Sequence, residues 1–121
     1  MSARQAPSLT RRVAAETVGT GALLAAVVGS GIMGERQAGG NAAIALLANA
    51  IATGAALTVL IFVFGLVSGA QFNPVVSAVA ASRRELPWRD AAVYIPAQIC
   101  GAFAGVVCAH LMFGETLIDI Q

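Results

Sequence analysis

The chain has 121 residues, of which 58% are hydrophobic and 11% are charged, and its formal net charge is +1. Soluble globular domains carry about 25% charged residues, so this composition excludes an ordinary soluble domain and a disordered chain. The small net charge does not favour nucleic-acid binding, and the length does not favour two domains.

The first long apolar run predicts a membrane-spanning helix over residues 13–33. No charged residue lies between Glu16 and Glu35, and about 20 apolar residues are enough to cross the hydrocarbon of a bilayer. Residues 1–12 then form a polar tail before this span.

The second apolar run is longer than one span requires and too short for two. It contains no charge between Arg36 and Arg83. It therefore predicts a span over residues 42–67, followed by an additional segment over residues 68–82.

The segment 68–82 begins with polar and helix-breaking residues in lipid-like surroundings. At membrane depth, irregular backbone persists only where protein buries it or where it lines a water-filled cavity. Gly69 permits unusual dihedral angles, Asn73 is a good helix N-cap, and Pro74 suits the first helical position. The segment therefore predicts a loop that dips into the membrane and a short helix that returns to the same side. The alternative is an ordinary loop with an Asn-Pro turn.

The third apolar run predicts a span over residues 91–113, because no charge lies between Asp90 and Glu115. Residues 114–121 then form a second tail. The first and third spans also carry small residues at every fourth position, a spacing that lets helices approach closely in lipid. These small residues are Gly21, Ala25 and Gly29 in the first span, and Ala97, Gly101, Gly105 and Ala109 in the third.

The arginines predict how the chain is oriented in the membrane. Six of them precede the first or third span (Arg4, Arg11, Arg12, Arg83, Arg84 and Arg89), and Arg36 lies in the remaining connection. Positive residues accumulate on the cytoplasmic side. We therefore expect a multi-pass protein of the cell membrane, specifically a bacterial inner membrane, with its N-terminus in the cytoplasm and its C-terminal tail, containing Glu115 and Asp119, outside.

Three polar side chains lie within the predicted spans, namely Glu16, Asn49 and Gln98. An ionisable residue within a span indicates function, and unpaired backbone groups in hydrocarbon cost several kcal/mol each. We expect Glu16 to accept hydrogen bonds from the dipping loop, with Gln98 bracing the loop from another side. The alternatives for Glu16 are an extended side chain that reaches the interface, or a favourable contact with a helix N-terminus.

The sequence predicts neither a metal site nor an enzyme. His110 is the sole histidine, and Cys100 and Cys108 are too far apart on one helix for a disulfide, about 12 Å at 1.5 Å per residue. No nucleophile, base and orienting group occur together. We therefore expect no catalytic residues and no cofactor.

Three motifs together resemble the aquaporin, or major intrinsic protein, family. Residues 68–75, Ser-Gly-Ala-Gln-Phe-Asn-Pro-Val, are similar to the first Asn-Pro-Ala loop of that family. Residues 15–20 are similar to its first-helix motif, and residues 97–102 to its third-helix motif. The resemblance extends from about residue 13 to residue 113, and it corresponds to the N-terminal half of an aquaglyceroporin-like member.

The resemblance implies an all-α membrane fold in which each repeat has three transmembrane helices and one re-entrant half-helix. It also implies that Asn73, followed by Pro74 and Val75, directs its amide into a pore and donates a hydrogen bond to passing solutes. The carbonyl groups of Gly69, Ala70, Gln71 and Phe72 would form a ladder of acceptors. The positive end of the short helix would repel cations.

Three positions depart from the common pattern of the family. Val75 replaces alanine and adds bulk beside the pore centre. Gln71 stands where the family often has histidine, and its amide can still bond Glu16. Thr53 occupies the position, twenty residues before Asn73, at which water-selective members carry a bulky aromatic residue. A wider filter is then expected, which admits glycerol-like polyols or metalloid hydroxides such as arsenite.

The family's second repeat supplies another Asn-Pro-Ala loop and a filter arginine. We therefore expect a channel component for water or small neutral solutes that works with a companion C-terminal half or in a homo-oligomer. An inverted copy of the same chain is disfavoured by the arginine bias. The alternatives are a truncated, non-conducting membrane remnant or structural protein, and a small multidrug-type transporter subunit, which would have four spans.

Overall fold

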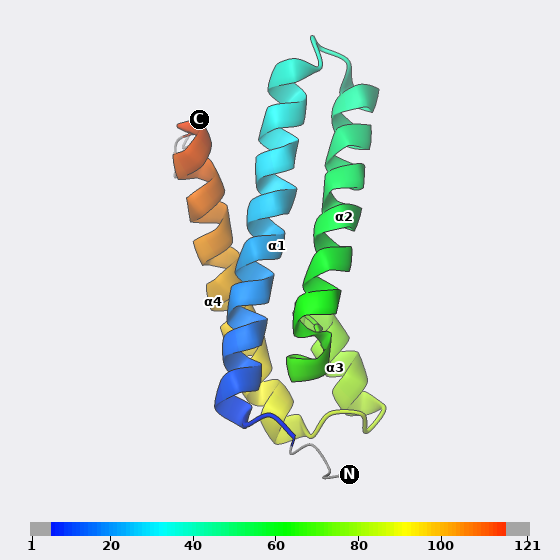
Figure 1. Cartoon of the computed structure of the whole chain (residues 1–121), viewed down its shortest axis with the longest axis vertical. Helices are drawn as coiled ribbons and strands as arrows, with labels where there is room; N and C mark the ends of the chain where they lie inside the picture. Colours follow the sequence, from blue (N-terminus) through cyan, green and yellow to red (C-terminus); the bar gives the residue numbers. More distant parts are fainter. Residues whose placement is uncertain (1–5, 116–121) are drawn as a thin grey trace.

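Four helices form the computed structural model, which describes residues 6–115. They are α1 (Leu9–Gln37), α2 (Ala42–Ser68), α3 (Pro74–Ser82) and α4 (Trp88–Phe113). Figure 1 shows α1 between α2 and α4, and α1 packs against both of them, whereas α3 packs against α4. The predicted all-α membrane fold is confirmed.

The three predicted spans lie within the three long helices. Each of α1, α2 and α4 is long and apolar enough to cross a membrane. The helix α1 begins before residue 13, because Ser8 caps it by accepting a hydrogen bond from the backbone N–H of Arg11 at 3.3 Å. Part of the predicted N-terminal tail is therefore helical. Arg4, Asp119 and the outer parts of both predicted tails lie outside the described residues.

The connection between α2 and α3 has the local structure that its residues favour. Gly69 ends α2 in the left-handed conformation, with φ of 88°. Asn73 caps α3, since its side-chain oxygen accepts a hydrogen bond from the backbone N–H of Val75 at 2.8 Å, and Pro74 occupies the first turn. Figure 1 shows that α2 and α3 both run towards the end of the molecule at which α1 and α4 begin, so the loop between them turns back before α3 starts.

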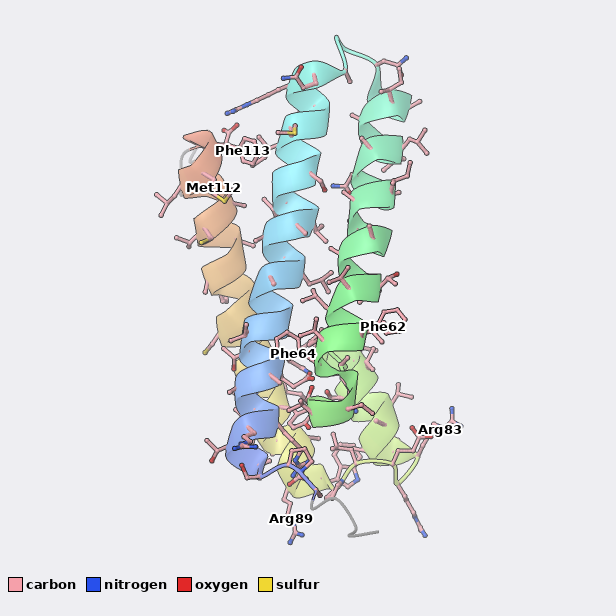
Figure 2. The ribbon with its side chains drawn as sticks, viewed as in Figure 1. Phe62, Phe64, Arg83, Arg89, Met112 and Phe113 are labelled. Atoms are coloured by element: carbon pink, nitrogen blue, oxygen red, sulfur yellow. The ribbon has the colours of Figure 1, made fainter. Side chains whose placement is uncertain are left out.

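The described arginines divide between the two ends of the molecule. Arg83 and Arg89 lie at the end where α1 and α4 start (Figure 2), the end that also carries Arg11 and Arg12. Arg36 lies at the opposite end, where it donates hydrogen bonds to the Phe113 carbonyl and to Glu115, each at 2.8 Å. The arginines of the described residues are thus concentrated at one end, which is the distribution on which the prediction of membrane orientation rests.

Small residues allow α1 and α4 to pack closely. A side chain at Gly101 would overlap the backbone carbonyl of Thr17, and a side chain at Gly105 would overlap that of Gly21. The pairing of α1 with α2 includes Asn49, whose amide donates to the Val27 carbonyl at 2.8 Å. Most of the apolar surface of α2 remains exposed, as on a helix that faces lipid or further protein.

Candidate functional site

Glu16 forms the centre of a buried polar cluster. Its side chain is 0% exposed and accepts four hydrogen bonds. The donors are the Ser68 hydroxyl at 2.5 Å, the backbone N–H of Gln71 at 3.2 Å, the backbone N–H of Phe72 at 2.8 Å and the Gln98 amide at 2.7 Å. A buried carboxylate is tolerated when such donors replace its water. One side chain of α1 thus holds the end of α2, the following loop and α4 together.

A second chain of hydrogen bonds connects α4 to the loop through α3. The amide of Gln98 also donates to the Ser77 hydroxyl at 2.9 Å, and that hydroxyl donates to the side-chain oxygen of Gln71 at 2.5 Å. The predicted bond from the Gln71 side chain to Glu16 is therefore wrong. The backbone of Gln71 bonds Glu16, because its side chain is engaged by the hydroxyl on the first turns of α3.

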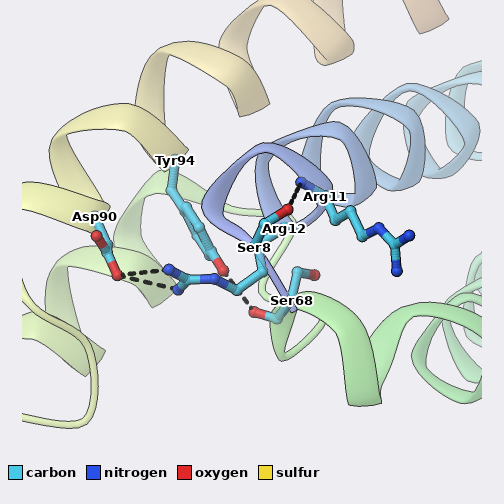
Figure 3. A network of polar contacts seen from close by, with 6 residues as sticks. All are labelled: Ser8, Arg11, Arg12, Ser68, Asp90 and Tyr94. Atoms are coloured by element: carbon cyan, nitrogen blue, oxygen red, sulfur yellow. Dashed lines mark hydrogen bonds and ion pairs between the residues drawn. The ribbon is translucent and has the colours of Figure 1, made fainter. Parts of the chain in front are cut away.

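A third group of residues contacts the end of α2 from the arginine-rich end of the molecule (Figure 3). The hydroxyl of Tyr94 donates to the Ser68 carbonyl at 3.0 Å, and Tyr94 is 0% exposed. Both terminal nitrogens of Arg12 donate to one oxygen of Asp90 at 3.0 Å. The guanidinium carbon of Arg12 lies 5.9 Å from the centroid of the Tyr94 ring. These contacts join the early parts of α1 and α4 to the last residue of α2, from which the loop begins.

Two loop residues adopt a conformation that is costly for non-glycine residues. Ala70 has φ of 50° and Phe72 has φ of 53°, and a left-handed residue of this kind costs of order 1–3 kcal/mol. The Phe72 ring is buried beside Gly19, where any side chain would overlap it, and it meets the Phe64 ring edge-to-face at 6.2 Å. Packing of this ring, together with the bonds to Glu16, stabilises the loop against that strain.

Several polar groups of the loop have no hydrogen-bond partner among the described residues. Asn73 is exposed, and within residues 6–115 its side-chain NH₂ has no hydrogen-bond partner. In the same described range, no donor reaches the carbonyl groups of residues 69–72. Gly69 and Gln71 line a groove of about 390 Å³ together with Val75 and other residues of α3. The exposed side chain of Asn73 and the groove-lining residues Gly69 and Gln71 are thus candidate contacts for a small polar molecule.

Thr53 and Val75 differ in how they are placed. Val75 follows Pro74 at the start of α3 and is 68% exposed. Thr53 lies on α2, fifteen residues before Ser68, which is about 22 Å along the helix at 1.5 Å per residue. Its hydroxyl oxygen is covered and lacks a partner among the described residues. The surface that Thr53 exposes is therefore formed by atoms other than its hydroxyl oxygen.

Sequence reasoning singled out Glu16, Gln98 and the loop, and the structure brings these together. It overlooked Ser77 and Tyr94. Tyr94 precedes Gln98 by four residues, so the two share one face of α4, and this spacing is a signal that could have found it. Within the described residues, no group of three or more His, Cys, Asp or Glu side chains could hold a metal ion.

Comparison with known proteins gives one family. Residues 3–119 match the family model described as major intrinsic protein. The chain is 54% identical over 113 residues to "Aquaglyceroporin AqpS" of Rhizobium meliloti (strain 1021), an alignment that covers 93% of this chain and 48% of that relative.

Plant proteins are similar at lower identity. The chain is 37% identical over 120 residues to "Probable aquaporin NIP5-1" of Arabidopsis thaliana, which covers 94% of this chain and 38% of the relative. It is 36% identical over 118 residues to "Aquaporin NIP3-1" of Oryza sativa subsp. japonica, with 93% and 37% covered. The chain thus spans half or less of the length of these relatives.

Proposed function

The chain belongs to the major intrinsic protein family, and from this membership we propose that it provides one half of a transmembrane pore for passive passage of water or small neutral solutes. The observation that carries the proposal is the loop after α2. Its backbone N–H groups at Gln71 and Phe72 are bonded to Glu16, while the Asn73 amide and the four carbonyl groups of residues 69–72 have no hydrogen-bond partner among residues 6–115.

A solute that leaves water loses hydrogen bonds to water, and the loop replaces them. The Asn73 amide donates to a hydroxyl or water oxygen, and the carbonyl groups of residues 69–72 accept the solute's protons. The N-terminus of α3, directly after Asn73, carries roughly half a positive charge. This field opposes cations in surroundings of low dielectric constant. The site therefore favours neutral molecules with both donors and acceptors.

The pore needs a second repeat, on the same or on a separate polypeptide, because one repeat leaves its solute-facing side open. The exposed apolar surface of α2 and the groove between the loop and α3 support this pairing. An inverted repeat would bring a second half-helix opposite α3. The arginine bias favours a companion half over an inverted copy of this chain, and it favours an orientation with the arginine-rich end in the cytoplasm. The Rhizobium relative supports a bacterial inner membrane.

For the solute, we propose glycerol-like polyols or metalloid hydroxides as well as water. The support is the small residue Thr53 where a bulky aromatic would narrow the path, together with the name of the Rhizobium relative, an aquaglyceroporin. A four-span multidrug-type subunit is not favoured, because three helices of the described chain are long and apolar enough to cross a membrane.

The experiment is a swelling assay in proteoliposomes. The chain and the part of the Rhizobium relative that it does not match are reconstituted separately and together, and light scattering follows swelling in water, glycerol and sodium gradients. Glycerol or water flux above that of either polypeptide alone, without sodium flux, is the expected result. Flux no greater than that of empty liposomes, both for the chain alone and for the combined preparation, would support a non-conducting membrane protein instead.

A further inference from the structure

Tyr94 caps the last turn of α2. The carbonyl of Ser68 is among the final four of that helix, which have no partner within the helix, and the Tyr94 hydroxyl donates to it at 3.0 Å. Ser68 also donates to Glu16 and accepts from the backbone N–H of Ala70 at 3.2 Å. Displacement of Tyr94 would therefore remove a hydrogen bond from Ser68, the residue directly before the loop.

Arg12 and Asp90 hold the Tyr94 ring from the outer side of the molecule. The guanidinium lies over the ring and bonds Asp90 through two nitrogens. The side chains of Arg12 and Asp90 are 24% and 10% exposed, so solvent screens this pair less than a surface pair. Asp90 lies in the first turn of α4, where the helix dipole also stabilises its negative charge. The arginine is thereby fixed over the tyrosine.

From this geometry we propose that Arg12 and Asp90 are positioning residues for the Asn-Pro loop. They act through the Tyr94 ring on the Ser68 carbonyl, and so they determine how firmly residues 69–73 are held. The ion pair lies at the end of the molecule, whereas the loop carries the proposed solute-binding groups. The importance of the ion pair for permeation rests on the proposed function, but the stability of the loop can be measured without any solute.

The chain contains a matched control at its opposite end. Arg36 also joins α1 to the far part of α4, bonds an acidic residue, Glu115, at 2.8 Å, and lies with its guanidinium carbon 5.6 Å from an aromatic centroid, that of Phe113. No hydrogen bond of Arg36 in the described chain leads to the loop. Arg36→Ala therefore removes a comparable pair without removing a contact to Tyr94.

The test is hydrogen exchange of single backbone amides in the 121-residue chain in lipid nanodiscs. Arg12→Ala releases the Tyr94 ring, and loss of the Tyr94 hydroxyl from the buried Ser68 carbonyl costs about 1–3 kcal/mol, so exchange at Gln71 and Phe72 should speed up by roughly 5- to 100-fold. Asp90→Asn should act in the same direction, and it preserves side-chain size in case Arg12→Ala fails to fold. Slow exchange in the middle of α4 reports an intact fold. Loop exchange at the wild-type rate in a folded Asp90→Asn variant overturns the proposal, as does an equal increase in Arg36→Ala.

A double-variant comparison tests the route through tyrosine. Tyr94→Phe removes the hydroxyl and keeps the ring. If Arg12 acts through that hydroxyl, Arg12→Ala should add little to the loop exchange once Tyr94→Phe is present. Independent, additive effects of the two substitutions would overturn this route. Because exchange is read without flux, a failure of the proposed pore leaves this result unaffected.

Discussion

Replacing Glu16 with glutamine tests the centre of the site with almost no change in shape. One carboxylate oxygen accepts from the Phe72 backbone and from Gln98, and the other accepts from the Gln71 backbone and from Ser68. Each oxygen therefore serves one backbone N–H of the loop. Whichever oxygen the new NH₂ group replaces, one of these two backbone groups loses its acceptor.

The expected magnitude follows from this count. A buried donor left unpaired costs about 1–3 kcal/mol, and the surviving bonds lose their charge assistance, which makes such bonds roughly twice as strong. Opening of the loop should become easier by about 2–5 kcal/mol. The free energy of global unfolding should fall by less, because a neutral amide avoids the desolvation cost of a buried carboxylate, which is several kcal/mol.

Amide exchange and solute flux measure the two consequences for Glu16→Gln. Exchange at Gln71 or Phe72 should rise at least about 30-fold, and water or glycerol flux of the assembled pore should fall. Glu35→Gln is the matched control, since Glu35 lies on the same helix and is exposed at the other end. Loop exchange equal in Glu16→Gln and in the wild type would refute the view that this carboxylate holds the loop.

Three further substitutions test the packing and the path. Gly105→Ala should lower the unfolding free energy in detergent by about 1–3 kcal/mol, because the added methyl group overlaps the Gly21 carbonyl. Gly54→Ala is the control, since a methyl group there meets nothing within 4 Å. Equal stability of the two variants would contradict the expectation. Asn73→Asp keeps a good helix cap but removes the amide donor, so swelling rates should fall roughly 2- to 10-fold at unchanged helix content by circular dichroism. Thr53→Phe should lower the ratio of glycerol to water flux in the same assay, and an unchanged ratio would exclude a filter at this position.

The sequence was sufficient where a residue has one favourable role in its surroundings. Asn73 and Pro74 specify a helix start, and Gly69 specifies a helix end, so α3 and its loop could be predicted locally. Glu16 could be identified because a charge near an apolar run needs partners. These predictions depend on short-range chemistry, and the described structure agrees with them.

Prediction failed where two segments distant in the chain compete for one group. The Gln71 side chain bonds Ser77 instead of Glu16, and the choice depends on how α3 packs against α4. The spacing of Tyr94, four residues before Gln98, indicates a shared face of α4, but it does not indicate Ser68 as the partner, because a tyrosine in a span also suits an interface. The start of α1 at Leu9 was missed for another reason: charge marks the edge of the hydrocarbon, whereas the Ser8 cap marks the start of the helix.

The buried polar cluster around Glu16 forms in a definite order during synthesis of the chain. Its donors come from the end of α2, the loop and α4, and all are synthesised after α1. Glu16 lies about 10 Å along α1 from Leu9, at 1.5 Å per residue, and so it is near the start of the first helix to be synthesised. Ribosomal synthesis must extend past Gln98 before the last donor is available. The complete set of four hydrogen bonds to Glu16 can therefore form only after Gln98 has been synthesised, although Ser68, Gln71 and Phe72 are available earlier.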